Sequence, residues 1–156
     1  MDAKEIKFTL KRYADASQLS EEEQNLITQA RLSALKAYSP YSKFSVGAAV
    51  LMENKEIITG NNQENSAFPA GICAEQVALS FANANWPEIS VQAIAISAVN
   101  AAGELVENIR PCGICRQVMV EVEKRFSKPI KVIMDGPSGV DVVDKAHFLL
   151  PLSFGL

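Results

Sequence analysis

The sequence predicts an α/β fold, a single domain in which strands alternate with helices. The chain of 156 residues is long enough for one domain with a sizeable hydrophobic core. Apolar residues make up 48% of it and charged residues 21%, which is ordinary for a globular protein. Short β-prone segments alternate along the chain with longer helix-like segments, an order typical of layered α/β structures.

The first part of the chain is predicted to be an arm followed by a helix. Ser20-Glu21-Glu22-Glu23 has the form of a capping box, in which Ser20 caps a helix and Glu23 reaches back to it. The helix is predicted to run to about Tyr38, because Ser39-Pro40 disfavours its continuation. Residues 1–19 precede it as an arm, and residues 20–156 form the predicted main domain. In the arm, alternating apolar residues predict a short edge strand around Ile6, Phe8 and Leu10.

Five further segments have the composition of strands. Residues 46–52 and 56–59 are separated by a polar turn and are predicted to form a hairpin. Residues 93–99 are continuously apolar, as is typical of a strand inside a sheet. Residues 130–134 are predicted to form another strand, and residues 140–143 a last strand at the edge of the sheet.

Two longer helices are predicted to begin at cysteines. The first starts at about Cys73 and ends near residues 83–85, and apolar residues occur all round it, which predicts a buried helix. A carboxylate on such a helix, Glu75, must be paired, associated with a metal or shifted in pKa. The second helix covers residues 112–126, and a short last helix is predicted to be capped by Asp144. The predicted solvent face of the second helix carries Glu121, Glu123, Lys124 and Arg125.

The charge pattern and the cysteine count narrow the range of possible functions. The net charge is -3 and the pI about 5.2, and no run of Lys or Arg could follow a phosphate backbone, so no nucleic-acid partner is expected. The sequence shows no export signal and no apolar stretch long enough to cross a bilayer, so we expect no membrane partner and a cytoplasmic location. Three cysteines cannot all pair within one chain, which favours metal or redox chemistry over a disulfide framework.

The cysteines stand in two short motifs, Cys73-Ala74-Glu75 and Pro111-Cys112-Gly113-Ile114-Cys115. The last two thiols are three residues apart and would lie on one face of a helix that begins there. Three protein ligands with one open position are typical of catalytic zinc, whereas structural zinc normally has four. The sole histidine, His147, is the only imidazole that could supply a fourth ligand, and we expect it to be a packed or partly exposed helix residue instead.

Helix N-termini suit such a zinc site, because their free N–H groups and positive dipole ends stabilise thiolates. A zinc ion lowers the pKa of a bound water to roughly 7. Glu75 lies within one turn of Cys73, so its carboxylate can accept the proton of that water and deliver it to a ring nitrogen or a leaving amine.

The order Cys-x-Glu and then Pro-Cys-x-x-Cys is the pattern of zinc nucleobase deaminases, in which the glutamate is the general acid/base and not a ligand. From about residue 21 to residue 154, the chain resembles the cytidine deaminases, specifically the small homotetrameric class that acts on free nucleosides. The resemblance implies a single-domain, three-layer α/β fold with a mixed sheet of about five strands and helices on both faces. Besides the zinc motifs, it rests on residues 38–49, 60–65, 112–118 and 149–155.

The resemblance also implies the reaction. Cys73, Cys112 and Cys115 would bind one zinc ion per subunit, and Glu75 would move protons. Zinc hydroxide would attack C4 of cytosine while Glu75 protonates N3 and then the departing ammonia. The products would be uridine from cytidine and deoxyuridine from deoxycytidine, a step of pyrimidine salvage.

Substrate contacts are implied in the same way. Phe44 would stack on the pyrimidine, Asn62 and Glu64 would hydrogen-bond the ribose hydroxyls, and the backbone N–H of Ala74 would bind the base carbonyl. Two aromatic side chains would complete the site of a neighbouring subunit: Phe68 and Phe154. Without the resemblance, the sequence would favour a packed core for Phe44 and Phe154, and a solvated loop for Asn62 and Glu64.

One residue departs from the pattern of this class, which usually carries arginine after Cys-Ala-Glu where this chain has Gln76. Zinc with three thiolates has a net charge of -1 and acidifies water less than a neutral centre would. Gln76 can donate hydrogen bonds but brings no charge, and Arg116 is the candidate to compensate. We expect a raised pH optimum or lower turnover than in relatives with arginine.

Three alternatives to free-nucleoside deamination are left open by the residues. The first is deamination of a cytosine nucleoside antibiotic such as blasticidin, since relatives of that kind also lack the arginine. The second is a non-catalytic, zinc-stabilised binding domain, which would keep its function in a Glu75→Gln variant. The third is a redox protein with a Cys112–Cys115 disulfide and no metal.

Overall fold

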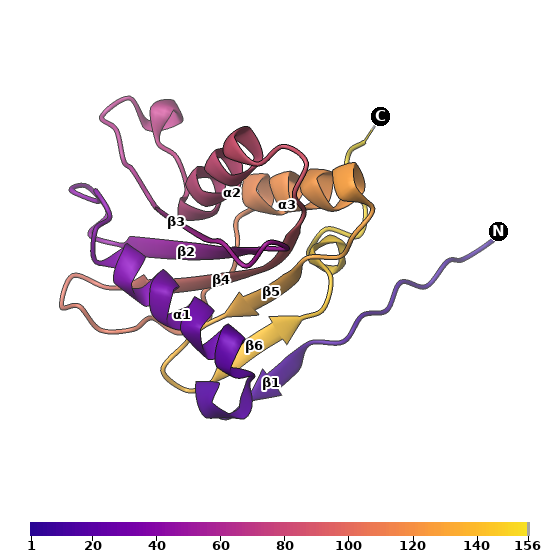
Figure 1. Cartoon of the computed structure of the whole chain (residues 1–156), viewed down its shortest axis with the longest axis horizontal. Coiled ribbons are helices and arrows are strands. Elements are labelled where there is room, and N and C mark those ends of the chain that lie inside the picture. Colours follow the sequence, from indigo (N-terminus) through magenta and orange to yellow (C-terminus); the bar gives the residue numbers. More distant parts are fainter. Residues whose placement is uncertain (156) are drawn as a thin grey trace.

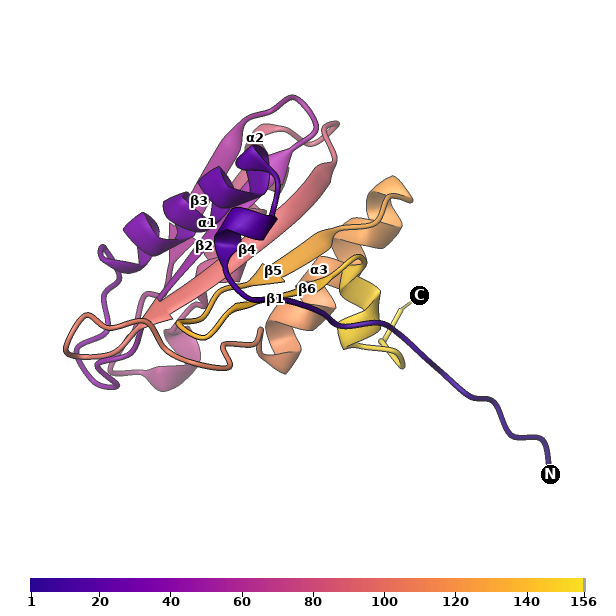
Figure 2. The ribbon, with the colours of Figure 1, turned by 90° about the horizontal axis from the view of Figure 1, so that it is seen from below.

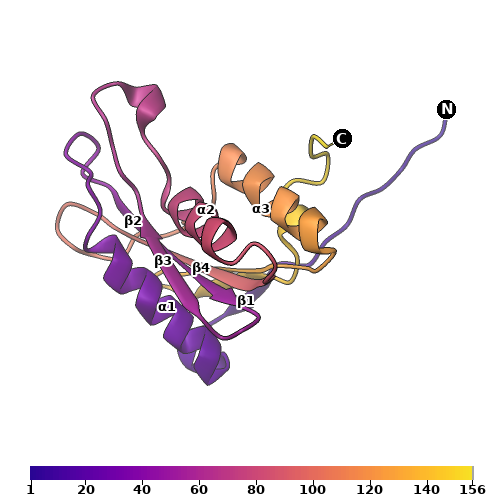
Figure 3. The same cartoon turned by 45° about the horizontal axis from the view of Figure 1, so that its top comes forward.

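A computed structural model describes residues 1–155, so Leu156, the last residue of the predicted main domain, lies outside the described residues. A six-stranded mixed sheet with the strand order β1-β6-β5-β4-β2-β3 forms the middle layer (Figure 1). Helix α1 covers one face of the sheet, and α2 and α3 lie side by side on the other (Figure 3). The predicted three-layer α/β fold is therefore confirmed, with one strand more than the expected five.

The bounds of the elements follow the chain in order. The strands are β1 (Lys11–Tyr13), β2 (Ser45–Met52), β3 (Ile57–Asn61), β4 (Val91–Val99), β5 (Lys131–Met134) and β6 (Val140–Val143). The α-helices are α1 (Glu21–Ala34), α2 (Ala74–Asn85) and α3 (Gly113–Phe126). Three short 3-10 helices complete the set: η1 (Ala16–Gln18), η2 (Phe68–Ala70) and η3 (Ala146–Leu149). Among these described residues, no helix is both long and apolar enough to span a bilayer.

Each face of the sheet has its own core because side chains alternate along a strand. On β2, Ala49 and Leu51 face α1, whereas Ala48 and Val50 face α2 and α3. The strands β4 and β5 are parallel and are joined through α3, while the other strand pairs are antiparallel. This crossover places the start of α3 beside the start of α2 on one face.

Several local predictions are confirmed. Ser20 and Glu23 form the capping box at the start of α1, and β2 and β3 form the expected hairpin. The helix α1 ends at Ala34, however, and not at Tyr38. Tyr38 is bound instead to a distant segment. Its N–H donates to the carbonyl of Asn62 at 3.0 Å, and the carbonyl of Tyr38 accepts from the N–H of Glu64 at 2.8 Å.

The predicted strand in the arm is displaced toward the main domain. Residues 1–10 have no regular structure and project from the body of the molecule (Figures 1 and 2), whereas Lys11–Tyr13 form β1. β1 pairs antiparallel with β6, so Val140–Val143 is an inner strand and the expectation of an edge strand there was wrong. The position of the strand is determined by the ion pairs from Lys11 to Asp144 and from Arg12 to Asp141. The alternation of apolar residues further upstream does not determine it.

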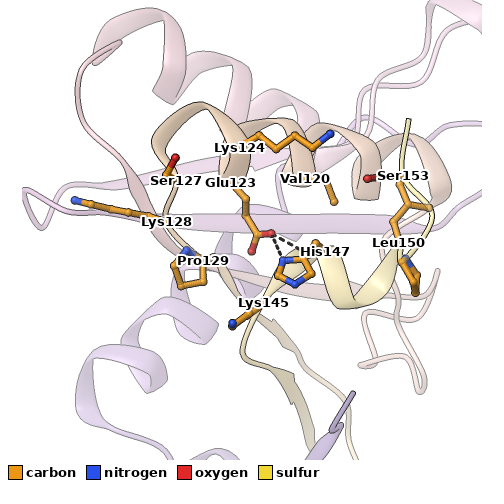
Figure 4. Close-up of a pocket in the computed structure, with 11 residues that line it drawn as sticks. Val120, Glu123, Lys124, Ser127, Lys128, Pro129, Lys145, His147, Leu150 and Ser153 are labelled. Carbon is orange, nitrogen blue, oxygen red and sulfur yellow. Dashed lines mark hydrogen bonds and ion pairs between the residues drawn. The ribbon is translucent and has the colours of Figure 1, made fainter. Parts of the chain in front are cut away.

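Glu123 was expected in solvent but is buried. Its carboxylate accepts hydrogen bonds from the N–H groups of Ile130 and Ala146 at 2.7 Å, and from the His147 N–H at 3.0 Å. The His147 ring lies 2.8 Å away through Nδ1 (Figure 4), and His147 is not part of the three-thiol cluster. Burial is tolerated because Glu123 satisfies backbone donors at the starts of β5 and η3. Asp144 does not cap η3, which begins after Lys145, because its carboxylate pairs with Lys11.

Replacing Glu123 by alanine is expected to lower the free energy of unfolding by about 3 kcal/mol, because the substitution leaves buried N–H groups without acceptors. Urea denaturation measures this quantity. The matched control is Glu121→Ala on the exposed side of the same helix, where the change should stay within about 0.5 kcal/mol. Equal effects of the two substitutions would contradict the structural role of Glu123.

The stability contributed by Asp141 should depend on pH. Hydrogen bonds and charge from Arg12 and Arg110 lower the pKa of this carboxyl below its usual value of 3.8. A lowered pKa means that the stabilisation is present above pH 3.8 and is lost as the pH falls through the folded-state pKa. In urea denaturation, wild type should therefore exceed Asp141→Asn by about 2 kcal/mol at pH 7. A difference that did not shrink below pH 3.8 would contradict this assignment.

Candidate metal centre and active site

The structure brings the three thiols together. Cys73 is the N-cap of α2 and Cys112 the N-cap of α3, and Cys115 lies in the first turn of α3. The Sγ atoms of Cys73 and Cys112 are 3.8 Å apart, those of Cys112 and Cys115 are 3.4 Å apart, and all three lie within 4.8 Å of one another. A tetrahedral zinc site with Zn–S bonds of about 2.3 Å places its sulfurs about 3.8 Å apart. The cluster therefore suits a zinc ion.

Close packing places the start of α2. A side chain on Gly60 of β3 would lie 2.5 Å from the carbonyl oxygen of Ala74 and 2.6 Å from the N–H nitrogen of Ala78. Glycine is needed at this position because the first turns of α2 rest directly on the hairpin. The side chain of Cys73 makes no capping hydrogen bond, so the N-terminal N–H groups of α2 remain available at the site.

The thiols share their protons. Hydrogen bonds from Cys115 and Cys112 lower the pKa of Cys73 to about 6. The pKa of Cys115 is raised, because this thiol donates to Cys73 and is buried. Cys73 is thus the first thiolate of the cluster, and a bound divalent cation would take the place of the remaining protons.

Glu75 is the second residue of α2 and only 4% exposed. Burial raises its pKa, and the nearby Cys73 thiolate raises it further. Hydrogen bonds from its own backbone N–H and from the Cys115 thiol act in the opposite direction. A buried carboxyl with a raised pKa next to a metal-binding cluster has the properties of a general acid/base.

A cavity of about 220 Å³ opens beside the cluster, and four of the predicted site residues line it together with Cys73 and Cys112. These residues are Phe44, Asn62, Ala74 and Glu75. The Asn62 side chain accepts from the Val46 N–H at 2.8 Å and donates to the Phe44 carbonyl at 3.0 Å. Asn62 therefore holds the segment that presents the Phe44 ring to the cavity.

The other three predicted contacts lie outside this cavity. Glu64 and Phe68 line a neighbouring hollow, where Glu64 accepts from the N–H groups of Tyr41 at 2.9 Å and Ser42 at 3.2 Å, and also from the Ser42 hydroxyl. The side chain of Phe68 packs edge-on against Tyr41. Phe154 lies near Lys124 and Arg125 of α3, and its carbonyl accepts from Gln117 at 3.0 Å. Phe68 and Phe154 are 75% and 73% exposed, so neither is packed in a core.

Three lining residues were not predicted as site residues, and one of them is Val46 of β2. Ile109 and Arg110 form a wall of the cavity directly before Pro111-Cys112. Their position next to the second cysteine motif could have indicated that Ile109 and Arg110 lie at the site. The ion pair of Arg110 could not have been predicted, because its partner Asp141 is distant in sequence.

Arg116, the candidate to supply the charge that Gln76 lacks, is bound to backbone carbonyls. Its guanidinium donates to the carbonyls of Pro111 at 2.8 Å and Leu149 at 3.0 Å. Gln76 is half-buried in the first turn of α2. These hydrogen bonds fasten the turn before Cys112 to the C-terminal segment.

Comparison with known proteins agrees with this geometry. The family model described as "Cytidine and deoxycytidylate deaminase zinc-binding region" matches residues 20–128. Cytidine deaminase of Halalkalibacterium halodurans is 41% identical over 99 residues, which are 64% of this chain and 70% of that protein. The probable cytidine deaminase of Dictyostelium discoideum is 34% identical over 84% of this chain and 82% of that protein.

Solved structures lead to the same family. The crystal structure of cytidine deaminase from Burkholderia pseudomallei aligns with a TM-score of 0.70 at 32% identity, over 87% of this chain and 100% of that one. Cytidine deaminase from Mycobacterium tuberculosis aligns with a TM-score of 0.63 at 30% identity, over 88% and 100% of the two chains. Since the family model matches more than half of the sequence, the chain belongs to the cytidine and deoxycytidylate deaminase zinc-binding family.

Proposed function

We propose that this protein is a zinc-dependent cytidine deaminase, which hydrolyses cytidine and deoxycytidine to uridine and deoxyuridine with release of ammonia. The observation that carries the proposal is the buried Glu75 in one cavity with a three-thiol cluster of zinc-like spacing. The relatives named above as cytidine deaminases support the choice of substrate. Such a reaction belongs to pyrimidine salvage.

The roles of the residues follow from their positions. Cys73, Cys112 and Cys115 would hold zinc, which supplies a water of lowered pKa as the nucleophile. Glu75 accepts a proton from that water and donates it to the ring nitrogen N3 of cytosine. The same carboxyl then carries the second proton of the water to the leaving amine, which departs as ammonia. Burial raises the pKa of this carboxyl, which favours its uptake of a proton from the water.

We propose further that the predicted substrate contacts serve the nucleoside. Phe44 and Ala74 line the cavity, where the Phe44 ring would bind the face of the base and the Ala74 N–H its carbonyl. Asn62, in the same cavity, and Glu64, in the adjoining hollow, would bind the ribose hydroxyls. Both side chains already hold the segments next to Phe44, so nucleoside binding would use groups that are oriented beforehand.

A homotetramer with shared sites is proposed for the assembly. The cavity of about 220 Å³ is smaller than the ~300 Å³ at which ligand sites usually begin, which favours completion by another subunit. Helix α2 was expected to be buried all round, yet Phe81 on its outer side is 53% exposed, so a partner would complete its burial. Ile114 at the start of α3 is also exposed, and Phe68 and Phe154 are available to reach a neighbouring site.

Two further features are proposed. Residues 20–156 would form the catalytic domain and residues 1–19 an arm, a division supported by the family match that begins at residue 20. A cytoplasmic location is supported by the three free cysteines, since reduced thiols persist in reducing compartments.

Glu75→Gln is expected to lower kcat by about 10³-fold, because the amide cannot move protons while its shape is retained. The assay is the loss of absorbance after adding cytidine, deoxycytidine or blasticidin separately to zinc-loaded protein. Turnover of the free nucleosides that disappears in the variant, with zinc content unchanged, supports the proposed function. Turnover of the antibiotic alone would assign the protein to a different substrate. No turnover of any of the three by wild type with zinc bound would overturn the proposal.

Cys112→Ser is expected to abolish stable zinc binding. The Cys112 sulfur lies beside both other sulfurs, and a serine hydroxyl there is a much poorer zinc ligand than a thiolate. Elemental analysis should give about one zinc ion per wild-type chain. Removal of zinc by a chelator should abolish turnover, and added zinc should restore it. A metal-free wild type with a Cys112–Cys115 disulfide in a thiol titration would instead indicate a redox protein.

A further inference from the structure

Two ion pairs attach the arm to the sheet, and they differ in how deeply their carboxylates are buried. On β1, Lys11 pairs with Asp144 at 2.7 Å, and both side chains are about half exposed. The neighbouring Arg12 donates through Nε and Nη2 to the two carboxylate oxygens of Asp141, at 2.6 Å and 2.8 Å. The Asp141 side chain is only 3% exposed, so the second pair reaches into the protein.

Asp141 is shared with the active site. Its Oδ2 atom also accepts from Nη2 of Arg110, the residue directly before Pro111-Cys112. The other terminal nitrogen of Arg110, Nη1, donates to the carbonyl of Ile109 at 2.7 Å. The guanidinium therefore connects the carboxylate to the backbone of the segment that forms one wall of the cavity.

The arm is built into this position. The carbonyl oxygen of Tyr13 approaches Gly139 so closely that a side chain there would lie 2.5 Å from it. Gly139 also has a φ of +136°, which disfavours other residues. The turn before β6 thus leaves room for β1, and β1 covers Asp141 from solvent.

We propose that Arg12 and Asp141 are positioning residues for the active site, through which the N-terminal arm holds residues 109–112 in place. The two-point contact from Arg12 sets the orientation of the Asp141 carboxylate, and that carboxylate sets the position of Arg110. Without Arg12, water would reach Asp141 and weaken its attraction for Arg110. The wall of the cavity and the turn that leads to Cys112 would then lose a fixed support.

This role rests on the proposed function, since it assumes that the cavity binds the nucleoside. A displacement of about 1 Å in a site can cost about 100-fold in rate, so the looser wall should lower kcat/KM measurably. Arg12 touches neither the cavity nor the thiols, and its effect would be transmitted entirely by Asp141 and Arg110.

The test compares Arg12→Met with Lys11→Met in the full-length, zinc-loaded protein. Both substitutions remove one ion pair from β1, but only the first alters Asp141. Arg12→Met should lower kcat/KM about tenfold and speed amide hydrogen exchange in residues 105–112, whereas Lys11→Met should change neither. Zinc affinity, measured by competition with a chelator, should weaken in Arg12→Met alone.

The proposal is overturned if the two variants have the same exchange in residues 105–112, or if Arg12→Met exchanges faster there with wild-type kcat/KM. The exchange measurement does not depend on turnover, so it still decides the positioning role if wild type proves inactive toward nucleosides. If Arg12→Met fails to fold, Arg12→Lys replaces it. The lysine keeps the charge but not the two-point contact, and faster exchange in that variant supports positioning, whereas wild-type exchange overturns it.

Discussion

The functional site depends on one packing constraint, the close approach of α2 to the hairpin formed by β2 and β3. Gly60 allows the first turns of the helix to rest on the strand, and small residues such as Ala74 and Ala78 line the contact. The crossover from β4 through α3 to β5 brings the second helix start to the same place. Cys73 and Cys112 cap these two helices, so the three-thiol cluster forms only where both N-termini meet.

The buried carboxylates divide into two kinds. Asp135 accepts from both sides of the Arg31 guanidinium at 2.7 Å and from Ser97 at 2.8 Å, and it joins α1 to the sheet. Asp141 and Glu123 are likewise supplied with several donors, and each holds separate segments of the chain together. Glu75 forms no ion pair with any residue that the structure describes, and burial raises its pKa. Among these four buried carboxylates, the one with the poorest compensation is thus placed at the thiols, where the proposed chemistry needs a proton carrier.

Local patterns in the sequence were sufficient for much of this structure. The capping box at Ser20, the hairpin and the mostly apolar β4 were all predictable, because each is specified by residues that are neighbours in the chain. The three cysteines could be grouped for a similar reason, since zinc chemistry restricts which residue types serve as ligands. The position of Glu75 two residues after Cys73 placed it near the same site.

The features that the sequence did not predict depend on partners far along the chain. By helical pattern Glu123 belongs to a solvent face, but η3 and β5 cover it and use its oxygens. β1 forms where Arg12 meets Asp141, and not where apolar residues alternate. The sequence by itself determined the type of chemistry, because ligand and proton-carrier residues are readable as motifs. Only the tertiary structure decided which charges are buried and what supports the cavity wall, because burial and ion pairing arise between segments that meet only on folding.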